Sequence, residues 1–251
     1  MSYSPMFPSQ PHLDGSPLLN MSEPNDLSPS SQPVEPAIAP SSRFLDLDDL
    51  MANGTLSWYM AQFLLQALHD QRRLIITGAA NTGKTTLLRA LAQAGISTHE
   101  RVLVIEDVEE LRLTGPDVIT RIGFDDADEP NGFRQALRLW PDRLIIGELL
   151  GPRLLDYLEA GLTESFGMLA TQHLRQPEDF VAYLGWMIQG YRGRPITEDE
   201  LVAKASQGVD LIVPMSRDKQ GHRRVVRAIQ PLPDGTYRTA FADEGTLRMR
   251  A

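Results

Sequence analysis

The stretch GAANTGKTT, Gly78–Thr86, decides the fold of this 251-residue chain. It follows the apolar run RLIIT and matches the phosphate-loop pattern GxxxxGK[ST] in full, at Gly78, Gly83, Lys84 and Thr85. In such a loop the glycines let successive backbone N–H groups turn inward around an anion. The helical pattern at 84–94 places a helix N-terminus against the same anion. Strand, loop and helix therefore occur in the order that a phosphate-binding site requires.

The residues of this loop have distinct expected roles. Lys84 is expected to reach the β- and γ-phosphates of a nucleotide, and the Thr85 hydroxyl to occupy one coordination position on Mg²⁺. The other candidate nucleotide contacts in the loop are Gly78, Asn81, Thr82, Gly83 and Thr86. We therefore expect ATP and Mg²⁺ as cofactors.

Apolar strands alternate with helical patterns along the chain, which is typical of parallel βαβ units. The predicted strands cover residues 73–77, 101–106, 118–122, 143–147, 167–172, 209–216 and 223–232. The predicted helices lie near 84–94, 131–140, 152–162, 177–190 and 197–206, and Asp46 and Ser57 are expected to cap two earlier helices. The turn DKQG joins the last two strands as an antiparallel hairpin. The fold class is α/β, a mostly parallel sheet flanked by helices with a C-terminal β-hairpin.

Residues 1–42 differ in composition from the rest of the chain. They contain nine of the 18 prolines, ten serines and no Lys or Arg. Such a composition buries too little apolar surface to offset the entropy of ordering the chain. We expect residues 1–42 to form a disordered Pro/Ser-rich tail and residues 43–251 to form one α/β domain.

The bulk composition excludes several classes of function. The net charge of −9 and the pI near 5.1 argue against a broad nucleic-acid-binding surface. The chain has no cysteine, which excludes disulfides, thiolate metal sites and cysteine nucleophiles. No apolar stretch approaches the roughly 20 residues of a transmembrane helix. A cytoplasmic protein without a transmembrane segment is expected.

Acidic residues follow two of the predicted strands. Glu106 ends the strand 101–106 and Asp107 comes directly after it, and Glu148 follows the strand 143–147. Ligands of open α/β sheets bind beyond the carboxyl ends of the strands, so these carboxylates can reach a bound phosphate. One carboxylate, with Asp107 as the candidate, would hold Mg²⁺ beside Thr85, and another would orient or deprotonate the attacking water. Solvated carboxylates at strand ends are the alternative.

His173 and three arginines complete the candidate set. His173 follows the strand 167–172, where it could sense the γ-phosphate, carry a proton or serve a structural role. Arg134 and Arg138 lie four residues apart on one predicted helix face, and Arg143 follows them. Each arginine is either a phosphate contact, within the subunit or from a neighbouring one, or an ordinary surface charge.

Five stretches together resemble the secretion and traffic ATPases of type II and type IV systems, nearest to those of type IV secretion, conjugation and tight-adherence (Flp) pili. The likeness runs from about Phe44 to Ile229. The stretches are LDLDDLMANGTLSWYMAQFLLQAL before the phosphate loop, RVLVIEDVEELRL as an Asp box, ALRLWPDRLIIGELLG as a Walker B region, LATQHL as a His box and VDLIVPMSRDKQGHRRVVRAI as a closing hairpin. The resemblance implies a RecA-like P-loop NTPase core.

The same resemblance assigns roles to individual residues. It implies that Glu106 is the Asp-box acid, Glu148 the Walker B acid that positions water, and His173 the His-box histidine. Arg134, Arg138 and Arg143 match the region in which the family keeps phosphate-contacting or intersubunit arginines. Family members are hexameric rings that drive pilus subunits or secreted substrates across the envelope. A homo-oligomer, or a mixed oligomer with a related ATPase, working at inner-membrane platform proteins is expected.

Two departures from the family leave other functions open. The family normally has an N-terminal domain that closes over the nucleotide, whereas residues 1–42 here read as a tail, and the loop interior Ala79, Ala80 and Asn81 lacks the usual glycines. A shortened, non-catalytic nucleotide-binding partner of a full-length ATPase is the main alternative. A nucleotide kinase is disfavoured, because no stretch reads as an acceptor-binding lid.

Overall fold

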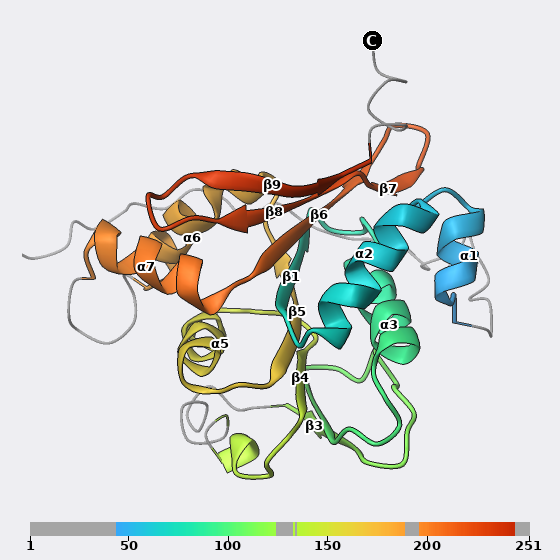
Figure 1. Ribbon diagram of the computed structural model, residues 1–251, viewed down its shortest axis with the longest axis horizontal. Coiled ribbons are helices and arrows are strands. Elements are labelled where there is room, and N and C mark those ends of the chain that lie inside the picture. The colour runs from blue at the N-terminus through green and yellow to red at the C-terminus, as the bar shows by residue number, and fades with distance from the viewer. Residues whose placement is uncertain (1–43, 124–132, 134, 189–195, 244–251) are drawn as a thin grey trace, which may run out of the picture. The chain divides into compact units, whose positions relative to one another are not determined.

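The computed structural model describes residues 44–123, 133, 135–188 and 196–243 (Figure 1). The proposed boundary between a tail at 1–42 and a domain at 43–251 stays a prediction, because residues 1–43 lie outside the described part. Of the helix expected at 131–140, residues 131, 132 and 134 lie outside it, residues 133 and 135–137 are helical, and residues 138 and 139 form a turn.

The described strands form one mixed, mostly parallel sheet, as the sequence predicts. They are β1 (Arg73–Gly78), β2 (Val102–Glu106), β3 (Val118–Ile122), β4 (Arg143–Ile146), β5 (Gly167–His173), β6 (Leu211–Arg217), β7 (Arg223–Val225), β8 (Arg227–Pro231) and β9 (Tyr237–Ala242). Their order is β3-β2-β4-β5-β1-β6-β8-β9, and β7 pairs with β6 beside this path. Strands β1 to β6 are mutually parallel, and β7, β8 and β9 add antiparallel pairs.

Helices cover both faces of the sheet (Figure 1). The helices α1 (Leu47–Ala52), α2 (Trp58–His69) and α3 (Lys84–Gly95) lie on one face, and α5 (Pro152–Thr163), α6 (Phe180–Ile188) and α7 (Glu198–Gly208) lie on the other. Strand β1 serves both cores, because Leu74 and Ile76 pack against the first layer and Ile75 against the second. Burial on both faces explains why the central strands read as continuous apolar runs.

The expected capping residues of the first two helices are confirmed. The Asp46 side chain accepts a hydrogen bond from the backbone N–H of Asp49, and Ser57 accepts one from Met60. These acceptors satisfy backbone donors that a helix start otherwise leaves unpaired. The turn between the two helices lies beside the C-terminal hairpin, since Thr55 O accepts a hydrogen bond from Val225 N at 2.7 Å.

The C-terminal strands differ from the prediction in two ways. The single strand expected at 223–232 is divided at Val226 into β7 and β8, and Val225 N–H donates to Thr55 O. Strand β9, which follows a turn with Gly235 at φ +81°, was not predicted at all. The antiparallel hairpin itself, β6 to β7, is present as expected.

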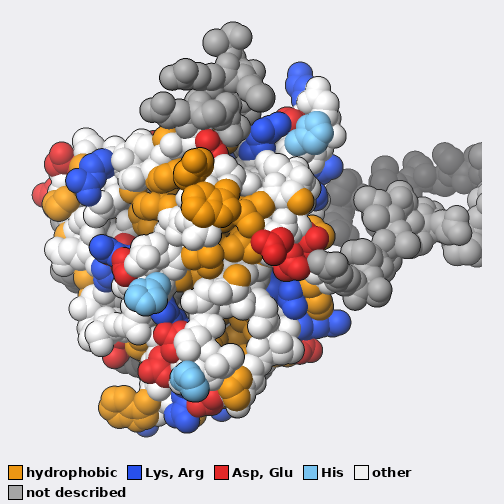
Figure 2. Space-filling model, turned by 45° about the vertical axis from the view of Figure 1, so that its right-hand side comes forward, with side chains coloured by type: hydrophobic (Ala, Val, Ile, Leu, Met, Phe, Trp, Pro, Cys, Tyr) orange, Lys and Arg blue, Asp and Glu red, His pale blue; other side chains and the backbone are white. Residues whose placement is uncertain are grey.

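The surface combines scattered charge with some exposed apolar side chains (Figure 2). Trp58 and Tyr59 begin α2 with 59% and 68% of their surface exposed and pack edge to face at 5.2 Å between ring centroids. Among the described residues, no helix has both the length and the apolar character needed to cross a bilayer.

Candidate functional site

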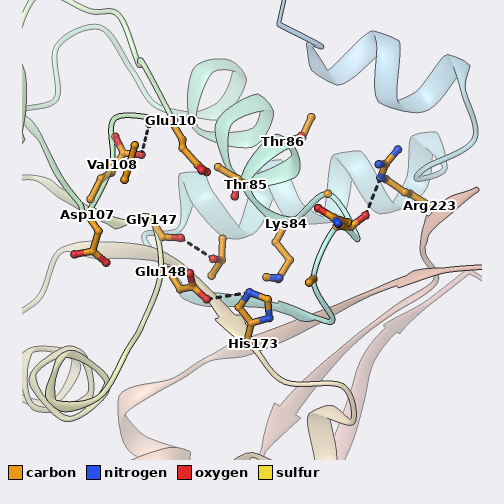
Figure 3. Close-up of a pocket in the computed structure, with 15 residues that line it drawn as sticks. Lys84, Thr85, Thr86, Asp107, Val108, Glu110, Gly147, Glu148, His173 and Arg223 are labelled. Atoms are coloured by element: carbon orange, nitrogen blue, oxygen red, sulfur yellow. Dashed lines mark hydrogen bonds and ion pairs between the residues drawn. The ribbon is translucent and has the colours of Figure 1, made fainter. Parts of the chain in front are cut away.

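A cavity of about 450 Å³ opens at the carboxyl edge of the parallel strands (Figure 3). The start of α3, the ends of β2 and β5, the segment after β4, and Arg223 of β7 all contribute to its lining. Its volume lies within the range of small-molecule sites, and its position matches the edge at which open α/β sheets bind ligands. The cavity therefore lies at the edge of the sheet where the sequence predicted the site.

The phosphate loop is shaped by its two glycines. Gly78 has φ +154° and Gly83 has φ +94°, and a Cβ on Gly78 would come within 2.7 Å of Met215 O. Asn81 takes φ +60°, a left-handed conformation that asparagine adopts more readily than most side chains. The non-glycine interior of the loop is thus compatible with a phosphate-loop backbone.

The N-terminus of α3 is open to an anion. Its N-cap is Gly83, which provides no side-chain hydrogen bond to the first turn. The first-turn N–H groups and the positive end of the helix dipole therefore face the cavity without a capping acceptor. This observation supports the fit of a phosphate group.

The candidate nucleotide-binding residues divide into two groups. Those that line the cavity are Asn81, Gly83, Lys84, Thr85 and Thr86. Gly78 and the buried Thr82 lie behind them, and the Thr82 hydroxyl donates to Ala79 O at 2.9 Å. The Lys84 ammonium also donates to Ala79 O, at 3.1 Å. Burial lowers the pKa of Lys84, and the nearby Glu148 carboxylate opposes this shift.

Glu148 and His173 meet beside Lys84 (Figure 3). Glu148 Oε1 lies 3.1 Å from His173 Nε2, and the two side chains are 33% and 44% exposed. His173 ends β5 directly opposite Gly78 of β1 in the parallel ladder. A carboxylate and an imidazole in contact can together orient a water molecule and accept its proton.

Glu106 lines the same cavity but is only 2% exposed. Its Oε1 accepts hydrogen bonds from the backbone N–H groups of Glu110 and Leu111, at 3.1 and 2.9 Å. Its Oε2 is buried and has no hydrogen-bond partner among the described residues. Burial raises the pKa of Glu106, and the two backbone hydrogen bonds partly offset this.

Asp107 lines the cavity with its carboxylate already engaged. The buried Arg153, at the start of α5, donates to Asp107 Oδ1 at 2.6 Å. Asp107 is 42% exposed, so a cation entering the cavity would compete with Arg153 for this carboxylate. The described residues contain no group of three or more His, Cys, Asp or Glu that could hold a metal ion. Mg²⁺ usually relies on few protein ligands and on substrate phosphates, which Thr85 in the loop could supplement.

Of the three candidate arginines, the structure describes Arg138 and Arg143, and neither of these lines the cavity. Arg134 lies outside the described residues, and Arg138 is exposed in a turn. Arg143 is 2% exposed at the first position of β4, whereas the cavity lies beyond the last position of this strand. Its placement corrects the expectation of a phosphate contact within the subunit, because the side chain is buried at the edge of the sheet opposite the cavity.

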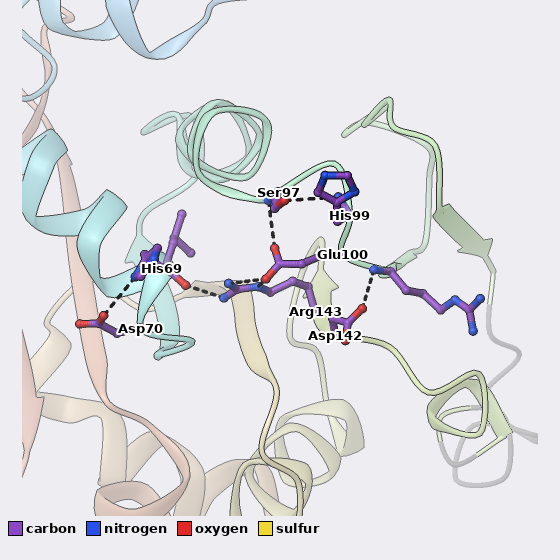
Figure 4. A network of polar contacts seen from close by, with 9 residues as sticks. His69, Asp70, Ser97, His99, Glu100, Asp142 and Arg143 are labelled. Atoms are coloured by element: carbon purple, nitrogen blue, oxygen red, sulfur yellow. Dashed lines mark hydrogen bonds and ion pairs between the residues drawn. The ribbon is translucent and has the colours of Figure 1, made fainter.

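Arg143 instead holds the amino edge of the sheet together (Figure 4). It donates to Glu100 Oε1 at 2.9 and 3.1 Å and to Leu68 O at 2.6 Å. It thereby links the end of α2 to the loop before β2 and the start of β4. These contacts indicate a structural role for Arg143.

Thr171 and Arg223 are among the cavity residues that were absent from the sequence-based set. Thr171 of β5 donates its hydroxyl to Gly147 O at 2.6 Å and so ties β5 to the segment that carries Glu148. Arg223 lines the cavity from β7. The sequence signalled the hairpin, but nothing local indicates which of its basic residues meets the loop.

Comparison with known proteins gives one matching family. Residues 37–189 match the family described as "Type II/IV secretion system protein". The probable conjugal transfer protein TrbB of Sinorhizobium fredii is 26% identical over 200 residues, 78% of this chain and 60% of that protein. The type IV secretion system protein PtlH of Bordetella pertussis is 31% identical over 65% of this chain and 51% of its own length.

The fold is also similar to that of solved ATPase structures. The VirB11 ATPase of the Brucella suis type IV secretion system, solved with sulphate, superposes with a TM-score of 0.63 at 26% identity, covering 70% of this chain and 54% of that one. The Legionella pneumophila ATPase DotB superposes with a TM-score of 0.52 at 20% identity, covering 69% and 49%. The latter shows similarity of fold alone. This chain spans between about half and 60% of the length of the curated relatives named above.

Proposed function

The chain belongs to the type II/IV secretion system protein family, and on this premise we propose that it is an ATP-binding and ATP-hydrolysing motor subunit. Its system would be type IV secretion, conjugation or pilus assembly. The proposal includes a ring oligomer, or a mixed ring with a related ATPase, in the cytoplasm at inner-membrane platform proteins.

One observation carries the catalytic part of the proposal. Lys84, Glu148 and His173 line one cavity with Thr85 and the uncapped start of α3. Phosphate-binding groups and a candidate base therefore lie within one site, which phosphoryl transfer to water requires.

Each residue has a proposed task in that site. The Lys84 ammonium and the N–H groups of the loop bind the phosphates, and Thr85 together with the phosphates would hold Mg²⁺, which supplies charge neutralisation. Glu148 orients the attacking water and takes its proton, while His173 holds the Glu148 carboxylate in place at 3.1 Å. Glu106 fixes the loop after β2 through its bonds to Glu110 and Leu111.

The ring oligomer is proposed from membership of the family. Hydrolysis coupled to transport needs domains or subunits that change position with the state of the nucleotide. A chain that bound nucleotide without turning it over would fit the alternative of a non-catalytic partner in a mixed ring.

Turnover and native mass distinguish these functions. ATP hydrolysis by the wild type would be measured beside Lys84→Ala and Glu148→Gln over a range of protein concentrations, with native mass determined in the presence of nucleotide. We expect turnover in the wild type only, rising with assembly. If the wild type hydrolysed ATP no faster than Lys84→Ala, the motor function would be ruled out. If it hydrolysed ATP as a monomer, the ring oligomer would be ruled out.

A further inference from the structure

Arg223 of β7 contacts the phosphate loop from the C-terminal hairpin (Figure 3). Its Nε donates to Asn81 O at 3.3 Å, across a separation of 142 residues in the sequence. Its Cδ lies 2.9 Å from the point where a Cβ on Gly83 would sit. Gly83 therefore leaves room for the Arg223 side chain as well as adopting a positive φ.

The charges of the cavity favour a second cation at the phosphates. Among the described residues that line the cavity, the lysine and arginine side chains are those of Lys84 and Arg223, whereas Glu106, Asp107, Glu110 and Glu148 are acidic. A nucleotide brings further negative charge into this cavity. A single ammonium balances that charge poorly, and a guanidinium can bind phosphate oxygens with two parallel N–H donors.

The hairpin also holds an uncompensated pair of charges. Arg223 lies directly opposite Arg217 in the antiparallel pair of β6 and β7. Like charges at opposite positions of a ladder destabilise it. Within the described part of the chain, no ion pair involves either arginine. An anion bound at the loop would relieve this repulsion.

We propose that Arg223 binds the phosphates of the nucleotide held by the loop, as a second cation beside Lys84. The inference rests on the proposed function and adds a nucleotide-binding residue to it. Lys84 and Arg223 both donate to loop carbonyls, those of Ala79 and Asn81, and phosphate oxygens offer these donors stronger, charged acceptors.

This contact would report nucleotide occupancy to a distant turn. Val225, two residues after Arg223, donates its N–H to Thr55 O at 2.7 Å, in the turn between α1 and α2. A shift of the Arg223 side chain from Asn81 to a phosphate therefore acts on a strand that is tied to the start of the described fold. The β6–β7 hairpin is the element that would carry the signal.

The test compares Arg223→Ala with Arg217→Ala, which removes an equal charge from the facing position. Arg217 lines a neighbouring groove with Ala79 and Ala80 rather than the nucleotide cavity, so it controls for long-range charge effects. Dissociation constants would be measured for Mg-ADP and for inorganic pyrophosphate in competition with a fluorescent nucleotide. We expect Arg223→Ala to weaken both by at least about tenfold, as for loss of a charge-assisted hydrogen bond, and Arg217→Ala to change them by less than about threefold.

A second variant separates phosphate binding from loop shape. Arg223→Gln keeps an N–H donor for Asn81 O but removes the charge, so we expect it to bind as weakly as Arg223→Ala. If the wild type binds nucleotide, two results would overturn the inference. One is an Arg223→Gln variant that binds as tightly as wild type, and the other is an Arg217→Ala variant that loses as much affinity as Arg223→Ala. A wild type that bound no better than Lys84→Ala would instead overturn the proposed function, and this inference with it. Melting temperatures without nucleotide verify that the variants are folded.

Discussion

Glu148 Oε1 lies 3.1 Å from His173 Nε2, joining the segment after β4 to the last residue of the neighbouring parallel strand β5. Thr171 strengthens the same junction by donating to Gly147 O at 2.6 Å. The segment that carries the candidate base is thus tied to β5, beside the lysine of the phosphate loop. A side chain held in one orientation loses less entropy when it positions a water molecule.

The first prediction concerns Glu148→Gln. Glutamine keeps the size of the side chain and can still contact His173, but it cannot accept a proton. We expect ATP turnover to fall by about a hundredfold or more, with the dissociation constant for ATP changed by less than about threefold. Glu164→Gln, an exposed acid before β5 at the opposite edge of the sheet, is the control and should behave as wild type. A parallel loss of affinity in Glu148→Gln would contradict a purely catalytic role.

The second prediction concerns Arg143→Met. The change leaves Glu100 and Leu68 O without their buried donor, while methionine fills much of the volume. We expect the free energy of unfolding to fall by about 3 kcal/mol in urea denaturation, with the nucleotide affinity of the folded fraction unchanged. The exposed Arg138→Met should change stability by less than about 0.5 kcal/mol. Nucleotide affinity lost at unchanged stability would restore the phosphate role that the sequence suggested.

Local chemistry explains which parts of the site were predictable from sequence. Gly78 and Gly83 are fixed by a loop that needs positive φ, so the motif reveals them directly. Glu148 and His173 follow predicted strands, and parallel strands end at one edge, so their proximity could be expected. The same reasoning argues against Arg143 as a phosphate contact, because Arg143 begins the strand that Glu148 follows. Five residues of strand span about 16 Å, which places Arg143 far from the cavity.

The unpredicted features depend on tertiary contacts. Arg223 is one of several basic residues in the hairpin, and only the packing of β7 against Thr55 and the phosphate loop distinguishes it. The burial of Glu106 likewise follows from the path of the chain after β2, which no periodic pattern encodes. Strand β9 escaped prediction because it carries Arg238 and Thr239 among its apolar residues and has no buried position.

The third prediction is a pH dependence that comes from Glu106. Burial raises the pKa of this carboxyl in the folded protein, so its contribution to stability is present below the pKa of the unfolded chain and is lost as the pH rises through the folded value. Glu106→Gln should therefore gain stability relative to wild type as the pH rises from 4.5, the ordinary pKa of a glutamate carboxyl, to neutral. Urea denaturation of both proteins without nucleotide measures this difference. Two parallel stability curves would show that the carboxyl titrates normally.

The fourth prediction separates the two candidate magnesium ligands, Thr85 and Asp107. The Asp107 carboxylate is bound by Arg153 at 2.6 Å, whereas Thr85 lines the cavity at the start of α3 beside the phosphate position. We expect Thr85→Val to raise the Mg²⁺ concentration for half-maximal ATP turnover by about tenfold, and Asp107→Asn to raise it by less than about threefold. Magnesium titrations at saturating ATP measure both values. An equal rise in Asp107→Asn would mean that the ion displaces Arg153, and Asp107 would then return as a metal ligand.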